Sequence, residues 1–276
     1  MERESAYRDM APAAFRRSVR AGQVGRVPTA GFCAGYAQAN LVVLPGAYAD
    51  DFFTFTHRNR AACPVLEVLR HTPWTRDMAA DGNILTDIPA YRVYRHGVLD
   101  EVLDDATPLW RANMVGFLIG CSFSFEEALI RAGIEMRHIA MGRNVPMYKT
   151  NISTRPAGPF AGPVVVSMRP MTPEAARLAA RITAAMPLVH GAPLHIGDPA
   201  KIGIRDIDRP DYGEAVDIRP GEVPVFWPCG VTPQAALELA RPTLAITHMP
   251  GHMFITDVLN SELNEVLETK RSEGRA

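Results

Sequence analysis

Two matching stretches of sequence decide the fold, Gly120-Cys-Ser-Phe-Ser-Phe-Glu-Glu127 and Pro228-Cys-Gly-Val-Thr-Pro-Gln234. Each begins at the end of an apolar run that is typical of a buried strand. Three residues after each cysteine stands a hydroxyl residue, Ser124 or Thr232, which predicts a helix N-cap. The sequence therefore predicts two strand–turn–helix units with a thiol in each turn. Backbone N–H groups and the helix dipole at such a turn can bind an anion or lower a thiol pKa.

A third, fainter unit lies between these two. The apolar run 164–168 leads into Arg169-Pro170, and Thr172-Pro173 then predicts a helix start. Aligning the three hydroxyl residues places Arg169 at the position that the two cysteines occupy. The pattern strand–turn–helix–strand then closes on a histidine in each unit, in order His138, His190 and His248.

Length and composition limit the possible classes of protein. A chain of 276 residues can bury one large core or two moderate ones. The formal net charge of −1, with no basic block, argues against a nucleic-acid partner. We expect no membrane partner and a cytoplasmic location, because no apolar run is long enough to cross a bilayer and the N-terminus lacks a secretory pattern. The four cysteines are widely spaced without a Cys-x-x-Cys motif, which favours free thiols.

Strands that alternate with helical segments predict an α/β fold with a largely parallel or mixed sheet. Gly- and Pro-punctuated short segments set one stretch apart. We therefore predict a main domain formed by residues 1–152 together with 223–276, and a smaller inserted α+β domain at 153–222. Further expected elements are helices at 4–24, near 50–55, at 63–69 and after 257, a hairpin at 87–102 turning at His96-Gly97, and short strands at 200–204 and 214–218.

Polar residues gather in the predicted turns, where a parallel sheet exposes its ligand crevice. Arginine matches the geometry of a carboxylate, and histidine titrates near neutral pH, so these types suit binding and proton transfer. Catalytic roles are expected for Cys121, Glu126, His190, Cys229 and His248. Substrate-binding roles are expected for Ser122, Ser124, Asn144, Tyr148, Arg169, His195, Thr232, Gln234 and His252.

Two further interpretations of these residues stay open at this point. His190, His195 and Asp198, like His248, His252 and Asp257, have the residue types of a metal site, but Pro and Gly interrupt both sets and no His-Glu-x-x-His is present. We expect no bound metal. Alternatively, two thiols facing one crevice would act as opposed acid and base, as in cofactor-independent racemases. The corresponding structural interpretation is that both cysteines are small buried residues.

Many motifs in order resemble one known family, from about residue 20 to 257. They are Pro28-Thr-Ala-Gly31, Gly35-Tyr-Ala-Gln-Ala-Asn-Leu41, Gly120-Cys-Ser-Phe-Ser-Phe-Glu126, Arg137-His138, Asn144-Val-Pro-Met-Tyr148, Val166-Ser-Met-Arg-Pro170, His190-Gly-Ala-Pro193, His195-Ile-Gly-Asp-Pro199, Cys229-Gly-Val-Thr-Pro-Gln234 and Thr247-His-Met-Pro-Gly-His252-Met253. Together they are similar to the bacterial hydro-lyases of the D-glutamate cyclase family. Phe32-Cys33-Ala34 and Pro228 depart from the family pattern.

The resemblance implies a carbon–oxygen lyase that releases water, on a three-layer α/β/α sandwich with a smaller α+β domain. A related eukaryotic enzyme converts D-glutamate to 5-oxo-D-proline. No phosphate loop, nicotinamide fingerprint or pyridoxal lysine motif is evident, so we expect no organic cofactor. The expected partner is a small carboxylate substrate, and a homodimer is the default oligomer. The alternatives are a non-catalytic carboxylate-binding protein of 5-oxoproline metabolism and a racemase-like proton-transfer enzyme.

Overall fold

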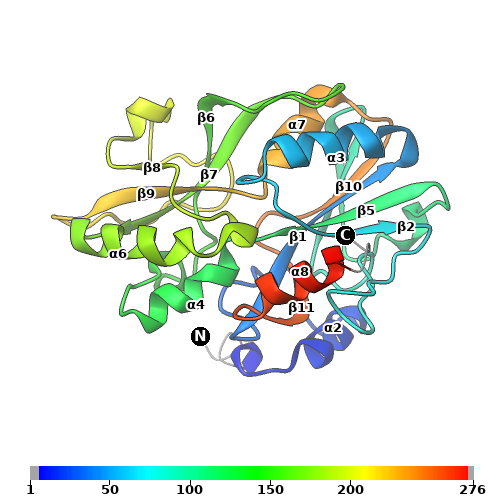
Figure 1. Cartoon of the computed structure of the whole chain (residues 1–276), viewed down its shortest axis with the longest axis horizontal. Helices are drawn as coiled ribbons and strands as arrows, with labels where there is room; N and C mark the ends of the chain where they lie inside the picture. Colours follow the sequence, from blue (N-terminus) through cyan, green and yellow to red (C-terminus); the bar gives the residue numbers. More distant parts are fainter. Residues whose placement is uncertain (1–5, 273–276) are drawn as a thin grey trace.

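The computed structural model describes residues 6–272, which form two β-sheets and the helices packed on them (Figure 1). The larger sheet has the order β2-β5-β1-β10-β3-β4, with β11 also paired to β1, and the smaller has the order β6-β7-β9-β8. The larger sheet contains β1 (Tyr36–Pro45), β2 (Val65–Arg70), β3 (Tyr91–Arg95), β4 (Val98–Leu103), β5 (Met114–Gly120), β10 (Ala245–His248) and β11 (Phe254–Leu259). The smaller contains β6 (Met147–Ser153), β7 (Pro163–Met171), β8 (His195–Ile196) and β9 (Val223–Pro228).

Helices cover both faces of the larger sheet, and β1 shows why. Leu41 and Val43 pack into one hydrophobic core, while Val42 and Leu44 pack into the other. A strand that is buried on both faces needs a continuous apolar run, as this one has. The α/β class is therefore confirmed. The helices are α2 (Pro12–Arg20), α3 (Ala49–Arg58), α4 (Phe123–Arg131), α5 (Arg137–Ala140), α6 (Pro173–Ala184), α7 (Thr232–Ala240) and α8 (Leu263–Ser272), with 3-10 turns at Gly46–Tyr48, Thr107–Leu109, Pro187–Val189 and Pro199–Ile202.

The recorded strand pairs are antiparallel throughout, where the sequence led us to expect a parallel or mixed sheet. The cause is the route of the chain. After β5, helices α4 and α5 lead to β6 in the other sheet, and after β9, helix α7 leads back to β10 in the larger sheet. Both cysteine units thus cross between sheets instead of returning beside their own strand, so alternation of strand and helix does not produce parallel neighbours here.

The strands of the smaller sheet lie within residues 147–228, so β6 has only its last residue inside the predicted insertion at 153–222, and β9 lies wholly outside it. The division of the chain into two domains stays a prediction. Within residues 6–272, no helix is both long and apolar enough to cross a membrane.

Several local predictions are confirmed and others are wrong. The hairpin at His96-Gly97 is present, and both turn residues have positive φ, which the tight connection requires. The segment predicted as a helix at 63–69 contains the edge strand β2 (Val65–Arg70), because pairing with β5 overrides the short apolar pattern. The predicted strand at 200–204 is a 3-10 turn, and 214–218 has no regular structure. The helix predicted at 4–24 is regular over Pro12–Arg20, and its first two residues lie outside the described part.

Candidate active site

The two cysteine turns come together where the sheets meet. Cys121 lies between β5 and α4, and Cys229 lies between β9 and α7, as predicted. Both thiols belong to one apolar cluster that also contains Val165 and Met253, and each cysteine is only 6% exposed. We call this region the junction site, defined by Cys121, Cys229 and the polar residues around them. One turn from each sheet thus contributes to a single site.

The hydroxyl residues of these turns do not cap the helices, which corrects the sequence prediction. The Oγ of Ser124 accepts from the Gln38 N–H (2.9 Å), and the Oγ1 of Thr232 accepts from the Val165 N–H (3.0 Å). Neither helix has a side-chain cap at its first residue. By contrast, Thr172 does cap α6 as predicted. The two hydroxyls therefore attach the helix starts to neighbouring strands and are not available to a substrate.

The thiols themselves accept backbone hydrogen bonds at the helix starts. The Phe123 N–H donates to the Sγ of Cys121 (3.5 Å), and the Val231 N–H makes the equivalent interaction with Cys229. Such bonds and the charge of Arg169 favour the thiolate, but burial outweighs them. Burial raises the pKa of Cys121 well above its ordinary value and raises that of Cys229 to about 11. Both cysteines are therefore thiols at neutral pH.

Asn40, which the sequence analysis did not select, joins the two turns. Its Nδ2 donates to the carbonyl of Gly120 (2.7 Å), the residue before Cys121. A Cβ on Gly230, the residue after Cys229, would overlap the same Asn40 amide. Asn40 is buried and belongs to the motif Gly35–Leu41 quoted above, so the resemblance carried a signal that composition and spacing did not. The glycine is required because the amide side chain fills the space where a side chain would stand.

Arg169 has a carboxylate partner within the protein. Its Nε donates to the Oε1 of Glu126 (2.9 Å), Nη2 donates to the same oxygen and to Ser122 Oγ (3.0 Å), and Nη1 donates to Ser167 Oγ (2.8 Å). Arg169 is fully buried and Glu126 is 2% exposed. The Nε2 of His138 lies 3.3 Å from the same Glu126 oxygen. Burial opposes ionisation of Glu126, but the charges of His138 and Arg169 hold its pKa below the ordinary value. The group that we predicted to bind a substrate carboxylate is therefore largely occupied by Glu126.

Three histidines each present an unpartnered ring nitrogen. The Nδ1 of His190 donates to the Ala61 carbonyl (2.8 Å), so its Nε2 carries the lone pair. The Nδ1 of His248 lies 3.1 Å from the Leu41 nitrogen and 3.3 Å from the Leu41 carbonyl oxygen; the Leu41 N–H donates to it in the shorter contact, which places the ring proton on Nε2. The Nε2 atoms of His190, His248 and His252 are buried and make no hydrogen bond. Burial lowers the pKa of His190 to about 4 and that of His248 to about 3, so both are neutral at pH 7.

Two of the remaining predicted residues join this region and two do not. Gln234 donates through Nε2 to the His248 carbonyl (3.0 Å), and Asn144 donates through Nδ2 to the Pro250 carbonyl (3.0 Å). Tyr148 instead donates to the Ile207 carbonyl (2.6 Å) within the other core, and His195 pairs with the Asp198 carbonyl on the surface. Those two residues are held by local structural contacts.

The aspartates of the two predicted metal sets also have structural partners. The Asp198 side chain accepts from the Ala200 N–H and caps a 3-10 turn. Asp257 pairs with the buried Arg16 (2.9 Å). Both carboxylates are thus already engaged away from the histidine ring nitrogens described above.

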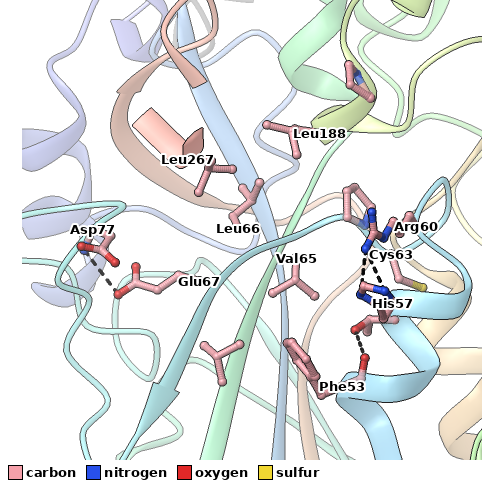
Figure 2. Close-up of a pocket in the computed structure, with 14 residues that line it drawn as sticks. Phe53, His57, Arg60, Cys63, Val65, Leu66, Glu67, Asp77, Leu188 and Leu267 are labelled. Carbon is pink, nitrogen blue, oxygen red and sulfur yellow. Dashed lines mark hydrogen bonds between the residues drawn. The ribbon is translucent and has the colours of Figure 1, made fainter. Parts of the chain in front are cut away.

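A cavity of about 460 Å³ lies between the end of α3, strand β2, residues 187–188 and α8 (Figure 2). Its walls are mainly apolar and include Phe53, Leu66, Leu188 and Leu267. It adjoins the first cysteine turn, because the carbonyl of Pro64, which also lines it, accepts from the Gly120 N–H (2.8 Å). This cavity is not visible in the sequence, because residues from five separate segments form it.

An α/β fold with a buried, polar junction between its sheets is the kind of scaffold that small-molecule enzymes use. A family model described as D-glutamate cyclase matches residues 115–257, the span that contains both cysteine turns. A Saccharopolyspora erythraea protein named "Putative hydro-lyase" is 57% identical over 253 residues, which cover 92% of this chain and 98% of that protein. "Putative hydro-lyase YcsI" of Bacillus subtilis is 55% identical over 255 residues, which cover 92% and 99%. A Stutzerimonas stutzeri protein with the first of these names is 52% identical, over 95% and 99%.

The chain belongs to the D-glutamate cyclase family. The resemblance drawn from its motifs is confirmed, and so is its placement among the lyases at the level of the family.

Proposed function

We propose that the junction site interconverts D-glutamate and 5-oxo-D-proline with release of water, and that it needs no organic cofactor. The observation that carries the proposal is the meeting of two helix starts, one after a strand of each sheet, around two buried thiols of one cluster with neutral histidines nearby. Helix N-termini favour carboxylates, and D-glutamate has two.

The proton balance of the reaction defines what the site must do. The ammonium group of D-glutamate first loses a proton, the neutral amine then attacks the γ-carboxyl carbon to form a C–N bond, and one carboxyl oxygen leaves. Two protons are lost from nitrogen, and the departing oxygen gains two protons to become water. The reaction involves no net oxidation. The site therefore needs one group that accepts a proton from nitrogen and one that donates a proton to oxygen.

Two histidines suit these opposite roles. The Nε2 of His190 offers a lone pair, and the Nε2 of His248 offers a proton. Low pKa values keep both rings neutral, and a bound carboxylate raises the pKa of a nearby histidine towards the working range. The thiols of Cys121 and Cys229 are the second candidates for proton donors, since both are protonated at neutral pH. The buried Arg169–Glu126 pair stabilises the first cysteine turn, because Arg169 also donates to the Oγ of Ser122, next to Cys121.

Ring formation tests the proposal directly. Purified protein is incubated separately with D-glutamate, L-glutamate and 5-oxo-D-proline, and the ring and open-chain signals are followed by NMR. We expect conversion of the D-compounds, and loss of most turnover in His248→Gln with the fold intact. Saturable binding of these compounds without conversion would instead support the non-catalytic carboxylate-binding protein.

A further inference from the structure

Arg92 is a partly buried arginine of β3 that the sequence analysis did not select. It pairs in the sheet with Thr247, so it lies beside His248 at the end of β10. Its neighbour Tyr91 packs into the hydrophobic core, and the alternation of side chains along a strand directs Arg92 to the opposite face.

The guanidinium of Arg92 has no acidic partner among the described residues, which sets it apart from the buried arginines. Arg16, Arg137 and Arg169 each have a carboxylate within 4 Å. The Nε of Arg92 is buried and makes no hydrogen bond. A buried donor that makes no hydrogen bond is costly, and a ligand that accepts from it would remove that cost.

The Cζ of Arg92 lies 5.7 Å from the centroid of the Tyr212 ring, within the range of a cation–π contact. Tyr212 also packs against the apolar cluster that contains Cys121 and Cys229. The nearby Glu238 does not supply the missing charge, because it is paired with Lys149 (2.8 Å). Arg92 therefore lies at the edge of the junction site, close to the side chains of Tyr212 and Tyr94, and its Nε is a donor without a partner.

Other unpartnered polar atoms lie in the same region. They are the Nε2 of His248, the Nε2 of His252 and the Oδ1 of Asn144, all buried without a hydrogen bond. The charge of Arg92 acts on both histidines, and the Asn144 amide packs against the backbone at Gly251, next to His252. The set combines a cation, an N–H donor and two acceptors, which matches a carboxylate beside an amine or amide N–H.

We propose that Arg92 binds the α-carboxylate of the substrate, with Asn144 and His252 accepting from its nitrogen. This assignment rests on the proposed function and replaces Arg169, whose guanidinium is paired with Glu126. The ligand class is a small carboxylate that carries an adjacent N–H. A planar guanidinium held on an aromatic ring can pair with a carboxylate through two parallel bonds, which lysine cannot reproduce.

Binding of matched ligands tests the assignment. The probes are 5-oxo-D-proline and 2-pyrrolidinone, which is the same ring without the carboxylate, measured by calorimetry. Arg92→Ala and Arg92→Lys are compared with Arg95→Ala, which removes an exposed arginine of the same strand that pairs with Asp100. We expect Arg92→Ala to weaken 5-oxo-D-proline binding roughly 10- to 100-fold, as for a lost charge-assisted bond. Arg95→Ala should leave it unchanged, and 2-pyrrolidinone should bind all variants alike.

Equal binding of 5-oxo-D-proline by the wild type and Arg92→Ala would overturn the assignment, and so would a failure of the wild type to bind it. If Arg92→Ala does not fold, Arg92→Lys answers the same question, because it keeps the charge but loses the paired geometry. Turnover separates the two proposals. If Arg92→Lys converts D-glutamate with an unchanged KM, the role of Arg92 is refuted but the cyclase activity is not. If binding of 5-oxo-D-proline depends on Arg92 but no conversion occurs, the cyclase activity is refuted and the role of Arg92 in binding is kept.

Discussion

Glu126→Gln is the substitution that most directly tests the physical interpretation of the site. Glu126 is 2% exposed, and its partner Arg169 is fully buried with three of its nitrogens bonded to Glu126, Ser122 and Ser167. Neutralising the carboxylate leaves a buried guanidinium without a counter-charge. Removing one partner of a buried pair typically costs about 3–5 kcal/mol.

Urea unfolding measures this cost. With an m-value of about 3 kcal/mol per M for a chain of this size, the urea midpoint should fall by roughly 1–1.7 M. The double variant Glu126→Gln with Arg169→Met removes both charges, and we expect it to be clearly more stable than Glu126→Gln alone. Asp104→Asn is the control, because its pair with Arg26 is exposed and should contribute less than about 1 kcal/mol.

The pH dependence adds a second measurement on the same pair. The pKa of Glu126 is lowered in the folded protein, so its stabilisation is present above the unfolded pKa of 4.5 and is lost as the pH falls below that value. Glu126→Gln should lack this acid-sensitive component. If Glu126→Gln lowers the free energy of unfolding by less than about 1 kcal/mol, or if the double variant is no more stable than Glu126→Gln, Glu126 and Arg169 do not form a buried ion pair that depends on both charges.

Three other predictions follow from the site geometry. Burial lowers the pKa of His190 from 6.5 to about 4 and that of His248 from 6.5 to about 3. The unfolded chain therefore binds more protons than the folded chain below pH 6.5. As the pH is lowered from 6.5 to 4, the free energy of unfolding should fall by up to about 1.4 kcal/mol per pH unit for each histidine. Replacing both by Gln should flatten that slope in urea titrations at several pH values, and an unchanged slope would contradict it. Because burial raises the pKa of Cys229 to about 11, native thiols should react with a disulfide reagent at pH 7.5 at least about 100-fold more slowly than the four thiols of the urea-unfolded chain, and comparable rates would show that the turns are open. Thr232→Val keeps the side-chain shape but removes the acceptor of the Val165 N–H, so it should lower the free energy of unfolding in urea by about 1–3 kcal/mol. An unchanged free energy of unfolding would show that the Thr232 hydroxyl does not hold the helix start to β7.

Local patterns were sufficient where the cause of structure is local. His96-Gly97 correctly identified a hairpin turn, because the positive φ of both residues is a local requirement of the tight connection. The strand-to-turn-to-helix order around Cys121 and Cys229 was also correct. The helix N-caps at Ser124 and Thr232 were wrong, because strands distant in sequence compete for those hydroxyls.

The candidate site was predicted in part for the same reason. Residue type and spacing selected Cys121, Cys229 and His248, which the structure brings to one region. Charge pairing is not visible in the sequence, so Arg169 was taken for a substrate ligand although Glu126, 43 residues away, occupies it. Arg92 was passed over because nothing in the sequence distinguishes an unpaired arginine from a paired one.

The two cysteine turns were set by the sequence alone, because an apolar strand, a turn and a helix start are encoded within about fifteen residues. Their meeting was decided by the tertiary structure. Each unit crosses to the other sheet, so residues from both sheets surround the two thiols, and burial there keeps the thiols protonated and the histidines neutral. Desolvation and ion pairing depend on which distant groups are packed together, and that is why only the folded chain distinguishes the saturated Arg169 from the unpaired Arg92.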